Sequence, residues 1–226
     1  MTDDIAAVLF DVDGTLVDTN YLHAVTWWQA FCQGGHADVP MTRIHRAIGM
    51  GSDRLLDELL PADRDRDADQ EMLTAHLTLY ATYWSRLRAF RGAADLLRAC
   101  KDRGLRVVLA TSASKRELGV MRKAMDADAA IDEATDADDV EASKPAADLV
   151  QAALDRAGVS AGQAIFVGDT IWDVEACKKA GVRCIALLSG GISRGELEDA
   201  GAVEIYDGPA DLLSALPRLL RADRDA

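Results

Sequence analysis

The chain has 226 residues, 49% hydrophobic and 28% charged, which is typical of a folded globular protein and long enough for one large domain or a core with a smaller insertion. Its 38 acidic and 25 basic residues give a net charge of −13, which argues against nucleic acid as a partner. No apolar run approaches the roughly 20 residues that cross a bilayer, and nothing resembles a secretory signal, so we expect a cytoplasmic protein with no membrane partner.

The first predicted strand is the apolar run 5–10, which ends abruptly at the polar cluster Asp11-Val12-Asp13-Gly14-Thr15. From about residue 18 to residue 90 the pattern changes to long helical stretches rich in Ala, Leu, Trp and His, interrupted by glycine pairs and by Pro61. This change of pattern predicts a separate helical unit.

Helices and strands alternate again after residue 91. The predicted elements in chain order are a helix over 93–103, a strand over 105–110, a strand over 164–167, a helix from about 171, a strand over 182–188, a strand over 202–205 and a helix over 210–220. Such alternation predicts an α/β fold, with a Rossmann-like parallel sheet covered by helices on both faces. We therefore expect a core domain of residues 1–16 and 91–226 and an inserted α-helical cap domain of residues 17–90.

Two further features have plain structural interpretations. The acidic stretch 126–141 is expected to be a solvated loop and helix face. The four cysteines show no CxxC pairing and no zinc-like spacing, so we expect packed, reduced thiols at Cys32, Cys100, Cys177 and Cys184.

Polar residues follow several of the predicted strands. Because ligands of a parallel sheet bind beyond the carboxyl ends of its strands, these residues are expected to converge on one crevice. They are Asp11 with Asp13, Thr111 with Ser112, Lys144, and Asp169 with Asp173.

Carboxylates that meet in one place repel each other unless a hard cation lies between them, and oxygen ligands suit Mg²⁺. Asp11, directly at the strand end, is the candidate nucleophile, which would form an acyl phosphate that water then hydrolyses. Asp13 could protonate the leaving alkoxide and later activate that water. We expect Asp169 on the metal and Asp173 behind it or binding its water.

The charge on the transferring phosphoryl oxygens needs fixed donors. The Thr111 hydroxyl, the Lys144 ammonium and loop N–H groups could supply them. Pro145 fixes the backbone after this lysine and could open the following helix. The remaining residues expected to contact the phosphoryl group or the substrate are Gly14, Thr15 and Ser112.

Each of these elements also has an ordinary interpretation when taken alone. The first aspartate cluster could be turn chemistry, Thr111 with Ser112 could cap a helix, Lys144 could be a surface lysine, and Asp169 could be a helix N-cap. Their joint order, each after a predicted strand, favours a catalytic site.

The motifs Asp-Val-Asp-Gly-Thr, Ala-Thr-Ser, Ser-Lys-Pro and Gly-Asp-Thr-x-x-Asp together resemble the four motifs of the haloacid dehalogenase superfamily. The helical insertion after the first motif resembles the C1-type cap of the branch that contains phosphoglycolate phosphatase and β-phosphoglucomutase. The resemblance implies that Asp11 is the nucleophile, that Asp13 is the acid and base and gives its backbone carbonyl to Mg²⁺, and that Asp169 ligates the metal beside Asp11. It implies that Thr111 and Lys144 hold the phosphoryl oxygens.

By this resemblance, the expected activity is that of a Mg²⁺-dependent phosphatase acting on a small phosphorylated metabolite, as a monomer or weak homodimer. Superfamily dehalogenases lack the second aspartate of the first motif, so Asp13 argues against carbon–halogen cleavage. A sugar-phosphate mutase, which shares every core motif, is the main alternative, and a non-catalytic binding module is a weaker one.

Substrate choice is expected to lie in the cap, which can close over the crevice. The loop 48–52, with Gly49, and the following Arg54 are the expected contacts, because glycine permits close approach and arginine can hold an anion. Other cap residues that could face the cleft are His23, His45 and Arg46. The aromatic residues of the cap are expected to pack in its core rather than to form a binding stripe.

Overall fold

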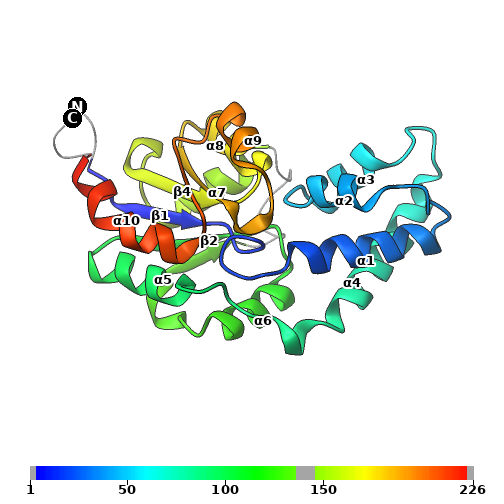
Figure 1. Ribbon diagram of the computed structural model, residues 1–226, viewed down its shortest axis with the longest axis horizontal. Helices are drawn as coiled ribbons and strands as arrows, with labels where there is room; N and C mark the ends of the chain where they lie inside the picture. Colours follow the sequence, from blue (N-terminus) through cyan, green and yellow to red (C-terminus); the bar gives the residue numbers. More distant parts are fainter. Residues whose placement is uncertain (1–3, 136–145, 223–226) are drawn as a thin grey trace.

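Figure 1 shows the computed structural model, which describes residues 4–135 and 146–222. A six-stranded sheet forms its centre, with every neighbouring pair of strands parallel and with the order β3-β2-β1-β4-β5-β6. The strands are β1 (Ala7–Phe10), β2 (Arg106–Ala110), β3 (Glu133–Thr135), β4 (Ala164–Gly168), β5 (Arg183–Leu187) and β6 (Glu204–Tyr206). The predicted Rossmann-like α/β class is confirmed.

Helices cover both faces of the sheet (Figure 1), because its central strands are apolar on both sides. One face packs against α5 (Ala93–Asp102), α6 (Lys115–Met125) and α10 (Pro209–Ala222). The other face packs against α7 (Asp148–Ala157), α8 (Ile171–Ala180) and α9 (Arg194–Ala200). Short 3-10 turns occur at Arg66–Ala68, Trp84–Arg86, Asp128–Ala130, Ala161–Gln163 and Leu188–Gly190.

A group of helices projects beyond the carboxyl ends of the strands, on the right in Figure 1. They are α1 (Asn20–Gln33), α2 (Met41–Ala47), α3 (Ser52–Leu59) and α4 (Asp69–Ala81). They have a hydrophobic core of their own, which includes Trp27, Phe31, Ile44, Leu55 and Met72. This group is hereafter the cap, and its separation as a domain of residues 17–90 stays a proposal.

The acidic stretch differs from the prediction. Residues 133–135 form the edge strand β3 rather than a solvated loop or helix face. The segment is fixed to the sheet because the Asp132 carboxylate accepts a hydrogen bond from the Val107 backbone N–H at 2.9 Å and pairs with the Lys101 ammonium. The sequence pattern does not predict such an edge strand, because the strand is stabilised by these contacts and not by alternating apolar residues.

Other predicted boundaries shift by up to two residues, as expected at element ends. The helix expected to open at Pro145 is α7, which begins at Asp148 instead. Pro145 itself lies outside the described residues. The cysteines are free thiols, and all but the half-buried Cys32 are buried, as predicted. In the described ranges, no helix combines the length and the apolar character that a membrane crossing requires.

Candidate active site

The sheet register sets the position of the site. Phe10, the last residue of β1, pairs with Leu109 on one side and Val167 on the other. The residues that follow β1, β2 and β4 therefore emerge together at one edge of the sheet, beneath the cap. The backbone N–H of Asp11 donates to the Val167 carbonyl at 2.9 Å, which holds Asp11 against the neighbouring strand.

Three carboxylates meet at this edge. Oxygen atoms of Asp11, Asp169 and Asp173 all lie within 4.8 Å of one another, and all three residues are buried. Burial, together with the nearby Asp11 and Asp173 carboxylates, raises the pKa of Asp169 well above its ordinary value. A divalent cation would remove this penalty, so the donor set fits Mg²⁺.

Asp173 belongs to this cluster as closely as the two expected ligands do. It lies in the first turn of α8, where its Oδ2 accepts hydrogen bonds from the Thr170 backbone N–H at 3.1 Å and from the Thr170 hydroxyl at 2.7 Å. This capping box fixes the carboxylate and begins the helix at the same time. Asp173 could therefore either ligate the metal or orient a group that does.

The Thr15 side chain contacts the carboxylate cluster. Its hydroxyl is fully buried and lies 2.8 Å from Asp169 Oδ1 and 3.1 Å from Asp11 Oδ2, so it bridges two carboxylates. Gly14 has φ +75°, and a Cβ there would lie 2.5 Å from Asp169 Oδ2. Neither residue is in the described lining of the pocket below, and both lie against the Asp169 carboxylate. Their contact with the substrate stays a prediction.

Sequence reasoning missed Asn20, the first residue of α1. Its Nδ2 donates to Asp169 Oδ2 at 2.7 Å and to the Gly190 carbonyl at 3.3 Å. No local pattern signals this role, because the partner lies 149 positions away. Asn20 ties the first cap helix to the carboxylate cluster.

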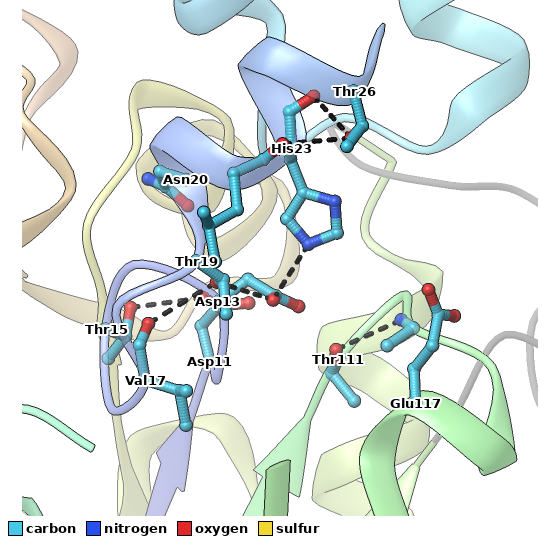
Figure 2. A network of polar contacts seen from close by, with 12 residues as sticks. Asp11, Asp13, Thr15, Val17, Thr19, Asn20, His23, Thr26, Thr111 and Glu117 are labelled. Atoms are coloured by element: carbon cyan, nitrogen blue, oxygen red, sulfur yellow. Dashed lines mark hydrogen bonds and ion pairs between the residues drawn. The ribbon is translucent and has the colours of Figure 1, made fainter. Parts of the chain in front are cut away.

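Asp13 lies apart from the cluster and faces the first cap helix (Figure 2). Its Oδ1 accepts a hydrogen bond from the Thr19 hydroxyl at 2.7 Å and lies 3.1 Å from His23 Nε2. His23, one of the cap residues that could face the cleft, therefore does reach the first motif. The side chain of Asp13 is therefore held by the start of the first cap helix and lies outside the cluster formed by Asp11, Asp169 and Asp173.

The residues after β2 form the opposite side of the site (Figure 2). The Thr111 hydroxyl accepts a hydrogen bond from the Ala113 backbone N–H at 3.0 Å, which shapes the turn before α6. Ser112 lines the pocket. Glu117 also lines it, with its carboxylate held by the Ser114 hydroxyl at 2.6 Å in a capping box. Lys144 lies outside the described residues.

A pocket of about 100 Å³ opens between these residues and the cap. The core contributes Asp11, Asp13, Ser112, Ala113 and Glu117. The cap contributes His23, Trp27, residues 48–52, Leu55, His76 and Leu77. A hollow of about 680 Å³ between α6 and β3 is larger but touches none of the predicted site residues, so chemistry rather than volume identifies the site.

Two predicted cap contacts have different outcomes. Gly49 lines the pocket, has φ +99°, and approaches the core so closely that a Cβ would lie 2.8 Å from the Thr170 side chain. Arg54 does not line the pocket. Its side chain is 55% exposed, with Nε 3.9 Å from an Asp53 carboxylate oxygen. The buried face of α3 is formed by Leu55, Leu56 and Leu59, which leaves Arg54 directed away from the core of the cap.

The cap also touches the core outside the pocket. His45 Nε2 lies 2.9 Å from the Gly190 carbonyl oxygen, and the Trp172 indole donates to the Arg46 carbonyl at 2.9 Å. The Arg46 guanidinium donates twice to one Glu196 oxygen, at 2.6 and 3.1 Å. These contacts fix the position of the cap over the strand ends.

Comparisons with known proteins agree with this geometry. A model of haloacid dehalogenase-like hydrolases matches residues 5–181. The chain is 28% identical over 214 residues to a phosphoglycolate phosphatase of Rhodospirillum rubrum, covering 91% of this chain and 88% of that protein. It is 31% identical over 215 residues, 91% of this chain, to Protein SUPPRESSOR OF QUENCHING 1, chloroplastic, of Arabidopsis thaliana, of which it spans only 20%.

A solved structure of a hydrolase from Pseudomonas syringae superposes with a TM-score of 0.90 at 32% identity, covering 95% of this chain and 99% of that one. The family match spans the first motif, the cap and the strand end at Asp169. The resemblance seen in the four motifs is thus confirmed, and the chain belongs to the haloacid dehalogenase-like hydrolase family.

Proposed function

We propose that this hydrolase is a Mg²⁺-dependent phosphatase that acts on small phosphorylated metabolites through a phosphoryl intermediate on Asp11. One observation carries the proposal. Asp11 shares a buried cluster with Asp169 and Asp173 and also lines the pocket, beside Asp13. A carboxylate in this position can both help to hold a cation and attack a phosphorus atom in the pocket.

The proposed reaction has two steps. In the first, a carboxylate oxygen of Asp11 bonds to phosphorus, the bond from phosphorus to the leaving oxygen breaks, and Asp13 gives its proton to that oxygen. In the second, Asp13 takes a proton from water as the water oxygen attacks phosphorus. The bond between phosphorus and Asp11 breaks, and inorganic phosphate leaves.

The proposed metal ligands are carboxylate oxygens of Asp11 and Asp169, with Asp173 beside them and the backbone carbonyl of Asp13. The metal, when bound, would neutralise charge on the phosphoryl oxygens. Thr111, Ser112 and Lys144 are the proposed partners of those oxygens, by the family resemblance. Thr15 and Asn20 keep the Asp169 carboxylate in place.

The test of this proposal is phosphate release from small phosphate esters, with Mg²⁺ and with excess chelator. We expect release that requires the metal. A sugar-phosphate mutase, the second candidate, would instead return the phosphoryl group to another hydroxyl of its substrate and would need a bisphosphate activator for full turnover. A cytoplasmic location and a monomeric or weakly dimeric state stay predictions.

A further inference from the structure

The cap side of the pocket has no lysine and no arginine among the described residues that line it. The side chains that the cap contributes are those of His23, Trp27, Ile48, Met50, Ser52, Leu55, His76 and Leu77. The two arginines nearest in sequence to the pocket loop 48–52 lie elsewhere, with Arg46 bound to Glu196 and Arg54 exposed. An anionic group on the leaving part of a substrate would therefore meet no lysine or arginine on the cap side, and the His23 imidazole already faces the Asp13 carboxylate.

His76 has an orientation that its neighbours define. Its Nδ1 lies 3.0 Å from the Thr26 hydroxyl oxygen. That hydroxyl is itself a donor to backbone carbonyls, with the Leu22 oxygen at 2.9 Å and the His23 oxygen at 3.1 Å. We take the hydroxyl proton to go to a carbonyl of the preceding helical turn, as threonine hydroxyls in helices commonly do, which assigns the imidazole proton to Nδ1 as the donor to Thr26. In this assignment the lone pair of His76 lies on Nε2.

The ring is also kept neutral. His76 is 4% exposed and stacks on Trp27 with ring centroids 4.1 Å apart. Burial, and to a lesser extent the neighbouring His23, holds the pKa of His76 well below its ordinary value. Within the described part of the chain, no hydrogen bond is seen at Nε2, and the ring lines the pocket. With the tautomer assigned above, His76 offers the pocket a hydrogen-bond acceptor without charge.

We propose that His76 selects substrates whose leaving group is uncharged and carries a hydroxyl, which donates a hydrogen bond to Nε2. The inference deepens the proposed phosphatase function and depends on it. A carboxylate in the same place would oppose the Nε2 lone pair and would lie in a pocket whose wall includes Glu117. The cap would then discriminate against acidic leaving groups such as glycolate.

Three phosphate monoesters with the same two-carbon skeleton test this inference. They are 2-hydroxyethyl phosphate, ethyl phosphate and phosphoglycolate. The leaving group ends in a hydroxyl in the first, in a methyl group in the second and in a carboxylate in the third. We expect kcat/KM for 2-hydroxyethyl phosphate to exceed that for ethyl phosphate roughly three- to tenfold, the effect of one hydrogen bond. We expect phosphoglycolate to be the poorest of the three.

Variants of His76 separate its role from the general properties of the pocket. His76→Phe keeps the stacking surface but removes the acceptor, so the preference for 2-hydroxyethyl phosphate over ethyl phosphate should fall to about one, mainly through KM. His76→Gln retains an acceptor and should keep part of the preference. Trp28→Phe, on the exposed side of α1, is the matched aromatic control and should leave the ratio unchanged.

The outcomes distinguish the two proposals. Mg²⁺-dependent hydrolysis in which phosphoglycolate equals or exceeds 2-hydroxyethyl phosphate overturns the inference and leaves the phosphatase proposal intact. A full hydroxyl preference in His76→Phe overturns the role of this residue. Absence of phosphate release from all three esters contradicts both proposals. If His76→Phe does not fold, the ranking by the unmodified chain still tests the hydroxyl preference, and His76→Gln still tests the role of His76.

Discussion

His23 Nε2 lies 3.1 Å from Asp13 Oδ1, so the first cap helix contacts the residue proposed to move the proton. The same oxygen accepts a hydrogen bond from Thr19, which directly precedes that helix. His23 in turn stacks on Tyr80 of α4, with ring centroids 3.9 Å apart. The position of the cap and the orientation of Asp13 are therefore linked.

We predict that His23→Ala lowers kcat by roughly ten- to a hundredfold and changes KM less. The reason is that Asp13 loses one of the groups that orient it. This loss in kcat is smaller than the full contribution of a positioned acid and base, because Asp13 itself remains. Steady-state kinetics on a preferred ester measures both constants. His36→Ala, a cap histidine outside the pocket, is the control. An unchanged kcat in His23→Ala would rule out this orienting role.

Asp169 gives a prediction about stability and metal together. Asp169→Asn removes a buried charge that its two neighbours repel, and Asn20 can turn its amide to present Oδ1, which lacks a partner among the described residues. Without metal, the variant should unfold at a temperature equal to or above that of the unmodified chain.

Mg²⁺ should stabilise only the unmodified chain, by about 2.7 kcal/mol at a hundred times its Kd. Thermal unfolding with Mg²⁺ and with chelator measures both effects. A variant that is strongly destabilised without metal, or that retains the full Mg²⁺ shift, would be inconsistent with the proposed metal site.

Gly49 tests the contact between the cap and the core. In Gly49→Ala, the new methyl group would lie 2.8 Å from Thr170 and the residue would keep φ +99°. We expect a loss of about 1–3 kcal/mol in the free energy of unfolding from backbone strain and a roughly tenfold rise in KM from displacement of the cap.

Gly35→Ala is the matched control, because Gly35 has φ +84° and nothing within 4 Å of a built Cβ. It should lose similar stability and keep its KM, as chemical denaturation and kinetics would show. Equal KM values in the two variants would mean that the Thr170 contact does not affect substrate binding.

Glu196 gives a prediction about pH. Hydrogen bonds from Ser193, and secondly from Arg46, lower the pKa of Glu196 from 4.5 to about 2. Because the folded-state pKa is the lower one, the stabilisation is present above the ordinary value and is lost as pH falls through about 2.

Carbon-detected NMR titration of the Glu196 carboxyl group measures this pKa directly. Ser193→Ala should raise it more than Arg46→Gln does, because the Ser193 hydroxyl makes the larger contribution. The reverse order would show that the contact between cap and core dominates instead.

Sequence patterns predict the strands that carry Asp11 and Asp169 well, because buried parallel strands are continuous apolar runs that end at polar residues. They do not predict β3, whose place depends on contacts of Asp132. They also miss residues that act across long separations, such as Asn20, since only the folded chain brings it to Asp169. The cap is the least predictable part, because its helices direct some polar residues into the pocket and others, like Arg54, to solvent.

Gly14 and Thr15 show a subtler limit. The motif places both beside the nucleophile, and a contact with phosphate follows naturally from sequence alone. In the fold, the loop turns back so that the Gly14 N–H donates to the Val17 carbonyl at 2.8 Å. This turn carries the Thr15 hydroxyl between Asp11 and Asp169 instead of into the pocket.

The central claim is that Asp11 receives the phosphoryl group. The most direct measurement is acid quenching during turnover with Mg²⁺, followed by peptide mass spectrometry of the unmodified chain and of Asp11→Asn. We predict one phosphoryl group on the peptide at Asp11, absent from the variant, whose folding is unchanged and whose turnover falls by roughly three orders of magnitude or more. Phosphate release by Asp11→Asn at the unmodified rate, or a phosphoryl group on another residue, would contradict the account.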